Sequence, residues 1–391
     1  MQLKDRMIDF CRRLIQIPSI SGQEQGVAEL IAQEMKALGF DRVWIDKYGS
    51  VIGMVQGTGG GKAVLFDGHI DTVPVSDSHQ WTKEPFGGEL SEGRIYGRGA
   101  SDMKGAVAAM VYALGAIAQG QERPTGDLYV SGTVQEENFE GVALASILEE
   151  VKPEVVIIGE ATELRLNIGQ RGRGELAVHT YGKSAHSANP QVGINAISKM
   201  QPVIKGIEKL KLNSHAVLGQ GIGVVTDIIS TPYPGSSVVP NHCRITIDRR
   251  LLVGETEQRV LAQFEELLDE IKASDPQFSG NVEFVKAEAQ CYTGVSIEGL
   301  RFFPAWLMDQ QGPVVLKAQQ AIKEAGLPVV LGTYSFCTNG SQSAGVKGIA
   351  TLGFGPSREN LAHSVDEYVE VEQLVGALKG YEALARVLSE K

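Results

Sequence analysis

Short apolar runs that end in polar residues recur along the chain and constrain its fold more than any other feature. Stretches with helical periodicity, for example 104–119 and 142–151, separate some of them. Buried strands alternating with helices predict an α/β fold with a largely parallel sheet, and such sheets bind ligands at the carboxyl ends of their strands. The runs and the polar groups that follow them are 62–68 before His69, 127–135 before Glu136 and Glu137, 154–159 before Glu160, and 348–354 before a glycine loop and His363.

The middle of the chain has a different order of elements. It reads as strand, helix, two strands, helix and strand, which is the βαββαβ order of a ferredoxin-like domain. We therefore expect a discontinuous α/β domain at 1–173 and 293–391, with the ferredoxin-like domain inserted at 174–292. The expected strands are 174–181, 221–229, 242–251 and 281–289, and the expected helices are 194–210 and 256–273.

Composition and local signals limit what kind of protein this is. The net charge of −11 disfavours binding to nucleic acid or to an anionic membrane. No apolar run approaches the ~18 residues of a membrane helix, and the N-terminus lacks the pattern of a secretory signal. The four cysteines are far apart and form no C-x-x-C pair, so we expect reduced thiols and a cytoplasmic protein. Ser21 followed by Glu24 predicts a capping box at the start of a helix.

The polar groups after the strands suggest a metal centre. A lone histidine such as His69 at a strand end is usually structural, and the adjacent acids Glu136 and Glu137 would usually be a solvated turn. Here Asp102, in the glycine-rich segment GRGASDMKG, adds a further carboxylate. A shared metal would offset the mutual repulsion of buried acids, and a mixed imidazole and carboxylate set suits zinc, with cobalt or manganese possible. Because successive strand residues face opposite sides, both glutamates reach one site only if the chain bends there.

Taken with their order, these motifs are specific. The sequence resembles the M20 family of metallopeptidases and deacylases over nearly its whole length. The resemblance is carried by GHIDTVP, GRGASDMKG, QEEN, the acid in IIGEAT, GKSAHSANP and LAHSVDE. It implies a zinc-peptidase-like catalytic domain that holds two Zn²⁺ ions per subunit. The ligands that it implies are His69, Asp102 and Glu160 for one ion, and Asp102, Glu137 and His363 for the other, with Asp102 bridging.

The resemblance also implies catalytic roles. Glu136 would be the general base, and Asp71 would accept a hydrogen bond from His69 and fix its tautomer. His186, in GKSAHSANP, would supply a donor to the oxyanion. In dimeric relatives this histidine comes from the partner, so the inserted domain would serve as a lid and as the contact of a homodimer.

Substrate binding is assigned in the same way. Arg250 would recognise a substrate carboxylate, whereas its neighbour Arg249 is expected to be a solvated strand residue. Asn339 and Gly340, in TNGS, would belong to a substrate loop. One position departs from the family pattern, because Ser237 stands where many relatives have asparagine, and this leaves the contacts there open.

The leading hypothesis is a di-metal amidohydrolase that cleaves an N-acyl amino acid or a dipeptide with a free carboxylate. A deacylase is slightly favoured over a carboxypeptidase or dipeptidase, and an N-carbamoyl substrate remains open. A metal phosphoesterase is less favoured because the sequence offers no cluster of basic residues, and a non-catalytic binding protein because the ligand set and Glu136 are intact. A serine hydrolase is set aside because SQSAG lacks the first glycine of G-x-S-x-G. The acyl group and the amino acid stay open.

Overall fold

The computed structural model describes residues 2–391 and divides into two compact units. The first unit comprises the described residues up to Gln170 together with Glu288–Glu298 and Trp306–Lys391, and the second comprises Arg171–Ala287 and Gly299–Ala305. The chain therefore crosses between the units four times. Among residues 2–391, no helix is both long enough and apolar enough to cross a bilayer.

A mixed nine-stranded sheet forms the centre of the first unit. Its order is β1-β2-β6-β3-β7-β20-β8-β18, and β19 pairs with β8. The pairs β6–β3, β3–β7 and β7–β20 are parallel, which confirms the expected mostly parallel sheet. The strands are β1 (Arg42–Ile45), β2 (Val51–Val55), β3 (Val64–His69), β6 (Leu128–Thr133), β7 (Val155–Ile158), β8 (Leu166–Gln170), β18 (Trp306–Leu307), β19 (Leu331–Tyr334) and β20 (Ala350–Gly353).

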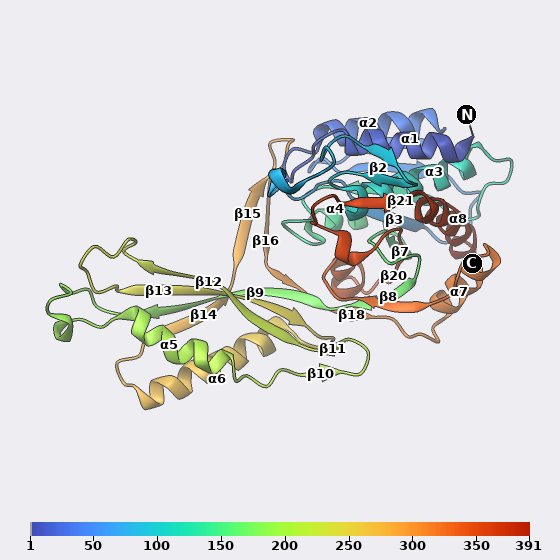
Figure 1. The fold of residues 1–391 in the computed structure, drawn as a ribbon. Coiled ribbons are helices and arrows are strands. Elements are labelled where there is room, and N and C mark those ends of the chain that lie inside the picture. Colours follow the sequence, from blue (N-terminus) through green and yellow to red (C-terminus); the bar gives the residue numbers. More distant parts are fainter. Residues whose placement is uncertain (1) are drawn as a thin grey trace. The chain divides into compact units, whose positions relative to one another are not determined.

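Helices cover both faces of this sheet (Figure 1). Alternate residues of β3 face opposite sides: Leu65 joins a cluster with Leu144 and Ile147 of α4, whereas Phe66 meets Tyr381 of α8 edge-on, with ring centroids 5.8 Å apart. The first unit also has a small sheet of β4 (Glu89–Ser91), β5 (Arg94–Tyr96) and β21 (Tyr368–Glu370), with the strand order β21-β5-β4. The helices are α1 (Leu3–Ile15), α2 (Gln25–Ala37), α3 (Gly105–Gln119), α4 (Val142–Val151), α7 (Pro313–Glu324) and α8 (Val371–Leu388).

Two glycines let α3 approach the strands that end at the polar groups. A Cβ atom at Gly68 would lie 2.8 Å from Cγ2 of Val107 in α3, which is closer than real Cβ contacts allow. A Cβ atom at Gly159 would likewise clash with Met110 of the same helix. Because these glycines directly precede His69 and Glu160, close helix packing fixes the backbone that carries both side chains.

The predicted capping box is wrong, although the helix after it is present. α2 begins at Gln25, and its N-cap residue Glu24 makes no side-chain capping bond. The hydroxyl of Ser21 instead donates to Asp71, 50 residues along the chain. A partner so far away in sequence replaces the local bond that the pattern suggested.

The second unit has the ferredoxin-like order that the sequence predicts. Its antiparallel sheet has the order β12-β13-β9-β14, and the short strand β17 also pairs with β9. Helices α5 and α6 begin at the side-chain caps Asn195 and Thr256 and cover one face of the sheet. The elements are β9 (Gly172–Tyr181), α5 (Ala196–Ile207), β10 (Ser214–His215), β11 (Gly219–Gln220), β12 (Ile222–Thr231), β13 (His242–Leu251), α6 (Glu257–Ser274), β14 (Gly280–Phe284) and β17 (Phe302–Phe303).

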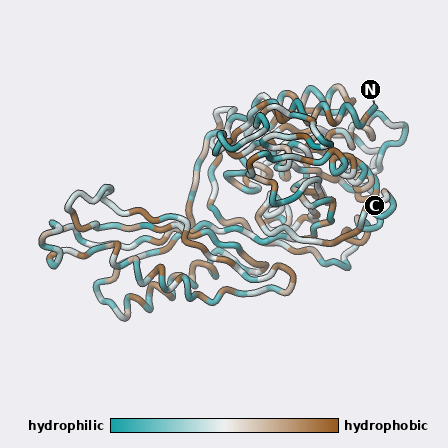
Figure 2. Tube along the Cα trace, in the orientation of Figure 1, coloured by the Kyte–Doolittle hydropathy of each residue, from teal (hydrophilic) through white to brown (hydrophobic). Residues whose placement is uncertain are grey.

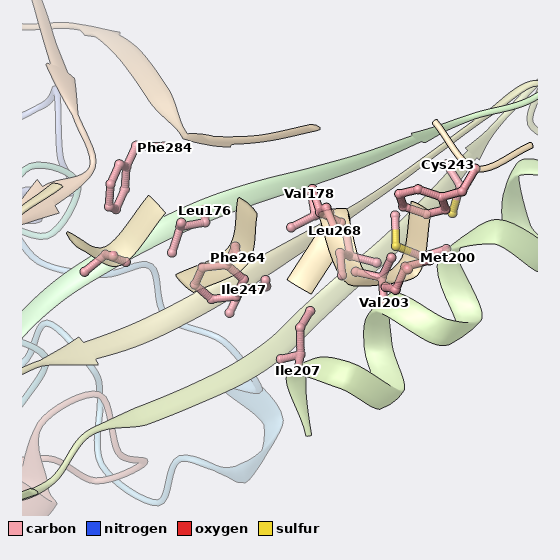
Figure 3. Close-up of a cluster of buried hydrophobic side chains, with 14 of the residues drawn as sticks. Leu176, Val178, Met200, Val203, Ile207, Cys243, Ile247, Phe264, Leu268 and Phe284 are labelled. Atoms are coloured by element: carbon pink, nitrogen blue, oxygen red, sulfur yellow. The ribbon is translucent and has the colours of Figure 1, made fainter. Parts of the chain in front are cut away.

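Hydrophobic side chains fill the space between these helices and the sheet. Figure 2 shows hydrophilic and hydrophobic residues alternating along α5 and α6, as amphipathic helices require. The close-up in Figure 3 shows Met200 and Val203 of α5 and Phe264 and Leu268 of α6 meeting residues of the strands, among them Val178. This cluster is the core of the second unit.

The last predicted strand of the insert, 281–289, is two strands in the structure. β14 ends at Phe284, and β15 (Lys286–Gln290) instead pairs with β16 (Ser296–Leu300). The alternation of apolar and polar residues changes phase at this point, because Phe284 and Val285 are consecutive apolar residues, and this is the signal that the sequence prediction missed.

Candidate metal centre

Five of the predicted site residues come together at the carboxyl edge of the parallel strands. His69 ends β3, Glu137 follows β6, Glu160 follows β7, and His363 lies in the loop after β20. Asp102 comes from the segment Ala100–Lys104 that leads into α3. The edge on which they meet is the one where α/β sheets bind their ligands.

Asp102 lies between the two imidazoles and presents one carboxylate oxygen to each. Nε2 of His69 lies 2.8 Å from Oδ1 of Asp102 and 3.4 Å from Oε1 of Glu160. Nε2 of His363 lies 3.1 Å from Oδ2 of Asp102 and 3.1 Å from Oε2 of Glu137. The arrangement therefore contains two groups of donor atoms that share one carboxylate.

The donor set fits divalent cations. Two groups, His69 with Glu136 and Glu160, and His69 with Asp102 and Glu137, have ligand atoms that lie within 4.8 Å of one another. Several carboxylates so close together repel each other strongly unless positive charge lies among them. Imidazole nitrogen and carboxylate oxygen are the ligands that zinc, cobalt and manganese accept.

Without a cation, the pKa values of several site residues are shifted toward forms that carry additional protons, which again indicates that the site favours positive charge. Burial alone would lower the pKa of His69, but its hydrogen bond to Asp102 raises that pKa well above its ordinary value. Hydrogen bonding to Asp102 raises the pKa of His363 to about 10. Burial raises the pKa of Glu160 to about 7 and raises the pKa of Glu136 well above its ordinary value. These shifts favour the protonated forms of His69, Glu160 and His363, and a bound cation would compete with those protons.

The two adjacent glutamates both reach the site because the chain bends before them. Gln135 has a φ of 60°, in the left-handed region that residues other than glycine rarely adopt. The carboxylate of Asp71 accepts hydrogen bonds from the backbone N–H of Glu136 (3.0 Å) and of Glu137 (3.1 Å). Glu136 is buried, and its Oε1 has no hydrogen-bond partner among residues 2–391.

Asp71 contacts His69 differently from the expectation. Nδ1 of His69 lies 2.9 Å from the backbone carbonyl oxygen of Asp71 and 3.6 Å from its Oδ1. The carbonyl oxygen can only accept, so it fixes the tautomer with Nδ1 protonated and Nε2 directed to the site. The carboxylate of Asp71 accepts the backbone N–H groups of Glu136 and Glu137 and so stabilises the turn that carries them.

Three further buried residues support the site, and the sequence reasoning did not assign them. Glu367 pairs with Arg98 at 2.7 Å and accepts hydrogen bonds from the backbone N–H of Ser101 (2.8 Å) and Asp102 (3.1 Å). The buried carboxylate of Asp67 lies two residues before His69. Arg98 and Glu367 lie inside the motifs GRGASDMKG and LAHSVDE, and Asp67 directly precedes GHIDTVP. Their closeness in sequence to the predicted ligands is the signal that could have identified them.

The substrate-loop residues have buried, internal positions. Nδ2 of Asn339 donates to Oδ2 of Asp67 at 2.8 Å, and Oδ1 of Asn339 accepts from the backbone N–H of Gly141 at 2.6 Å. The indole of Trp306 lies against Gly340 so closely that a Cβ atom there would clash. The amide of Asn339 is therefore engaged within the first unit.

The other predicted residues lie in the second unit. His186 is in the loop after β9, and its Nδ1 accepts a hydrogen bond from the backbone N–H of Ala188 at 3.0 Å. Nε of Arg250, on β13, lies 3.0 Å from Oδ1 of Asp248. The backbone carbonyl of Ser237 accepts a hydrogen bond from the N–H of Ser187 at 2.9 Å, in the loop that carries His186.

The expectation that Arg249 is solvated is wrong. The side chain is fully buried, donates to the backbone carbonyl of Ile222 at 3.1 Å and pairs with Glu255 at 3.2 Å. Arg249 has the same strand parity as Ile245 and Ile247, which face the helices. That periodicity was the signal that the reasoning missed.

Fold and site together define a class of metal-dependent hydrolases with an α/β domain and an inserted ferredoxin-like unit. The chain belongs to peptidase family M20/M25/M40, whose family model matches residues 65–387. It is thus related to peptidases and deacylases, which are hydrolases of amide bonds.

Individual proteins show how far the similarity extends. The chain is 34% identical to the Escherichia coli K12 protein YgeY over 385 residues, which covers 97% of this chain and 93% of YgeY. It is 30% identical to the succinyl-diaminopimelate desuccinylase of Cereibacter sphaeroides KD131 over 250 residues, covering 61% of this chain and 65% of the enzyme. The crystal structure of Bacillus subtilis YXEP, a dinuclear metal-binding peptidase of the M20 family, shares the fold, with a TM-score of 0.73, 15% identity and coverage of 99% and 98%.

Proposed function

We propose that this protein is a di-metal amidohydrolase that cleaves the amide bond of an N-acyl amino acid or a dipeptide with a free carboxylate. The observation that carries the proposal is the shared carboxylate of Asp102, which lies between His69 and His363. Glu136 directly precedes the proposed ligand Glu137, and its buried Oε1 has no hydrogen-bond partner among residues 2–391. Zinc is the proposed metal, and cobalt or manganese could replace it.

His69, Asp102 and Glu160 would hold one ion, and Asp102, Glu137 and His363 the other. Two such ions supply a water of lowered pKa and polarise the scissile carbonyl.

Glu136 would act as the general base. Its Oε1 has no competing hydrogen bond among residues 2–391, so it is free to accept the proton of the attacking water. The same oxygen would then deliver the proton to the leaving amine. His186 would donate to the oxygen that becomes negative, and Arg250 would bind the substrate carboxylate through its planar fork of N–H groups.

Deacylation is the favoured reaction. The similarity to a succinyl-diaminopimelate desuccinylase supports an N-acyl amino acid as the substrate. A carboxypeptidase or dipeptidase activity, or cleavage of an N-carbamoyl group, would use the same groups. A hydrolysis screen of N-acetyl, N-succinyl, N-carbamoyl and dipeptide substrates, each with zinc, cobalt and manganese, would distinguish these reactions.

Glu136→Gln tests the mechanism. The amide keeps the shape of the side chain but cannot take a proton, so kcat should fall by about 10²–10⁴-fold while metal content stays at the wild-type level. Glu163→Gln, at an exposed acid three residues after Glu160, is the control and should leave kcat unchanged. Retained turnover in Glu136→Gln would remove Glu136 as the base.

The proposal includes a homodimer formed through the second unit. β12 is an edge strand of its sheet, and it exposes the side chains of Ile222, Val224, Ile228 and Ile229. Edge strands with exposed apolar residues are suited to pairing with another chain. If His186 then acts on the partner's site, mixing the inactive variants Glu136→Gln and His186→Ala should restore activity, and a mixture that stays inactive would argue against a shared site.

We also propose a cytoplasmic location. All four cysteines are buried and free of disulfides, as a reducing compartment favours. Fractionation of cells that express the protein would test this.

A further inference from the structure

The segment Ser19–Glu24, before α2, lies alongside the chain that leaves β3. Ile20 and Thr72 form a parallel β-bridge, and the N–H of Thr72 donates to the carbonyl of Ser19 at 2.9 Å. The hydroxyl of Ser19 donates to the carbonyl of Ile70 at 2.7 Å. This segment is therefore hydrogen-bonded directly to the backbone between His69 and Thr72.

Two side chains of the segment extend further, to the groups that hold the two catalytic glutamates. The hydroxyl of Ser21 donates to Oδ2 of Asp71 at 2.7 Å. Oε1 of Glu24 accepts hydrogen bonds from the backbone N–H of Gly22 (2.9 Å) and of Gln135 (3.2 Å). Glu24 is fully buried, and neither residue has a part in the proposed mechanism.

The turn at 135–137, which Ser21 and Glu24 contact through Asp71 and Gln135, depends on surrounding hydrogen bonds. The left-handed φ of Gln135 is strained and persists only where surrounding contacts impose it. Glu24 holds the backbone N–H of Gln135. The side chain of Gln135 donates through Nε2 to the carbonyl of Gln290 at 3.2 Å and accepts at Oε1 from Nδ2 of Asn138 at 2.9 Å. Asp71, which receives the N–H groups of Glu136 and Glu137, is itself completely buried and depends on its donors for orientation.

We propose that Ser21 and Glu24 are positioning residues for Glu136. Ser21 orients the carboxylate that anchors the N–H groups of Glu136 and Glu137, and Glu24 anchors the N–H of the strained residue before them. The N-terminal segment thereby sets the direction in which the base points. This inference rests on the proposed role of Glu136 as general base, since a misdirected base lowers turnover without changing substrate affinity.

Ser21→Ala should show the effect with the least disturbance. Asp71 loses one of its donors, and its carboxylate gains freedom to rotate away from the turn. We expect kcat to fall about tenfold because small displacements of a catalytic group have large effects on rate. KM and metal content should not change, because the variant removes no ligand and no proposed substrate contact. Ser21→Thr restores the hydroxyl and should recover most of the turnover.

Ser19→Ala is the matched control. It removes a buried hydroxyl and one hydrogen bond from the same segment, but the acceptor is the carbonyl of Ile70 and not Asp71. Its stability loss should be at least as large as that of Ser21→Ala, and its kcat should stay at the wild-type value. Glu24→Gln keeps an acceptor oxygen and should remain active, whereas Glu24→Leu should lose turnover in the same way as Ser21→Ala.

Hydrogen exchange measured by mass spectrometry gives a readout that does not depend on activity. In the full-length chain, both metal-loaded and after chelation, peptides that cover 134–141 should exchange faster in Ser21→Ala than in the wild type and in Ser19→Ala. Equal exchange and equal kcat in the two serine variants would overturn the proposal. If Glu136→Gln kept its turnover, the proposed function would fail, and the exchange comparison would still decide whether Ser21 holds the turn.

Discussion

Asn339 provides a direct test of whether the TNGS segment supports the fold or binds substrate. In Asn339→Ala, Oδ2 of Asp67 loses its donor at 2.8 Å, and the N–H of Gly141 loses its acceptor at 2.6 Å. Both groups stay buried, and among residues 2–391 Asp67 keeps only the hydroxyls of Ser131 and Thr133 as donors, at its other oxygen. Each orphaned group destabilises the protein by about 1–3 kcal/mol, so the expected total is about 4 kcal/mol.

Urea unfolding followed by tryptophan fluorescence measures this loss in the right part of the molecule. The three tryptophans, Trp44, Trp81 and Trp306, all lie in the first unit. With an m value of about 3 kcal/mol/M, the midpoint should fall by about 1 M or more. The control Asn360→Ala changes an exposed asparagine and should shift the midpoint by no more than about 0.2 M. An unshifted midpoint in Asn339→Ala together with a raised KM would refute the structural role and favour a substrate contact.

Two further predictions concern the buried ion pair of Arg249 with Glu255 and the pH dependence of stability in the chelated protein. Arg249→Ala leaves the carboxylate of Glu255 buried without its partner and should destabilise the second unit by about 3–5 kcal/mol, whereas Arg250→Ala should change stability little and raise KM. Thermal unfolding followed by circular dichroism measures the stability of both variants. Equal stability of Arg249→Ala and Arg250→Ala would contradict a stabilising role for the buried pair. In the chelated protein, the folded-state pKa values of His363 (about 10) and Glu160 (about 7) lie above their unfolded values. The native state then binds more protons, so stability should fall as pH rises from 4.5 through 7 for Glu160 and from 6.5 to 10 for His363. Metal-loaded protein should lack this decline, and unfolding curves at several pH values that show none in the chelated protein would count against the assigned ionisation.

Much of the first unit could be predicted because parallel strands buried on both faces are continuous apolar runs. Residues 64–66 and Val155–Ile158 have this pattern, and His69 and Glu160 follow them within three residues. The order of these strands along the chain does not specify which strands pair in the sheet. Because they are parallel, however, their carboxyl ends all lie at the same edge of the sheet. The strand endings therefore predict where His69, Glu137 and Glu160 meet, whereas Asp102 lies in the segment before α3, and the assignment of ligands to two ions came from the resemblance to the M20 family.

The errors arise where a distant partner decides the outcome. Ser21 has the local pattern of a capping residue, which would accept a hydrogen bond from a backbone N–H of the helix N-terminus. Its hydroxyl instead donates to the buried carboxylate of Asp71, a strong charged acceptor. Likewise the strand expected at 281–289 divides because β15 pairs with β16, and in the sequence only the consecutive apolar residues Phe284 and Val285 mark the change. The two bonds of Asn339 depend on Asp67 and Gly141, which lie far from it in the sequence.

The dependence of turnover on bound metal tests the central claim most directly. The protein would be stripped with a chelator, verified as metal-free by elemental analysis, and titrated with zinc, cobalt or manganese while hydrolysis of its best N-acyl substrate is followed. The shared position of Asp102 between His69 and His363 predicts no turnover in the stripped protein and full recovery near two equivalents of metal per chain. Undiminished hydrolysis by the verified metal-free chain would contradict the account.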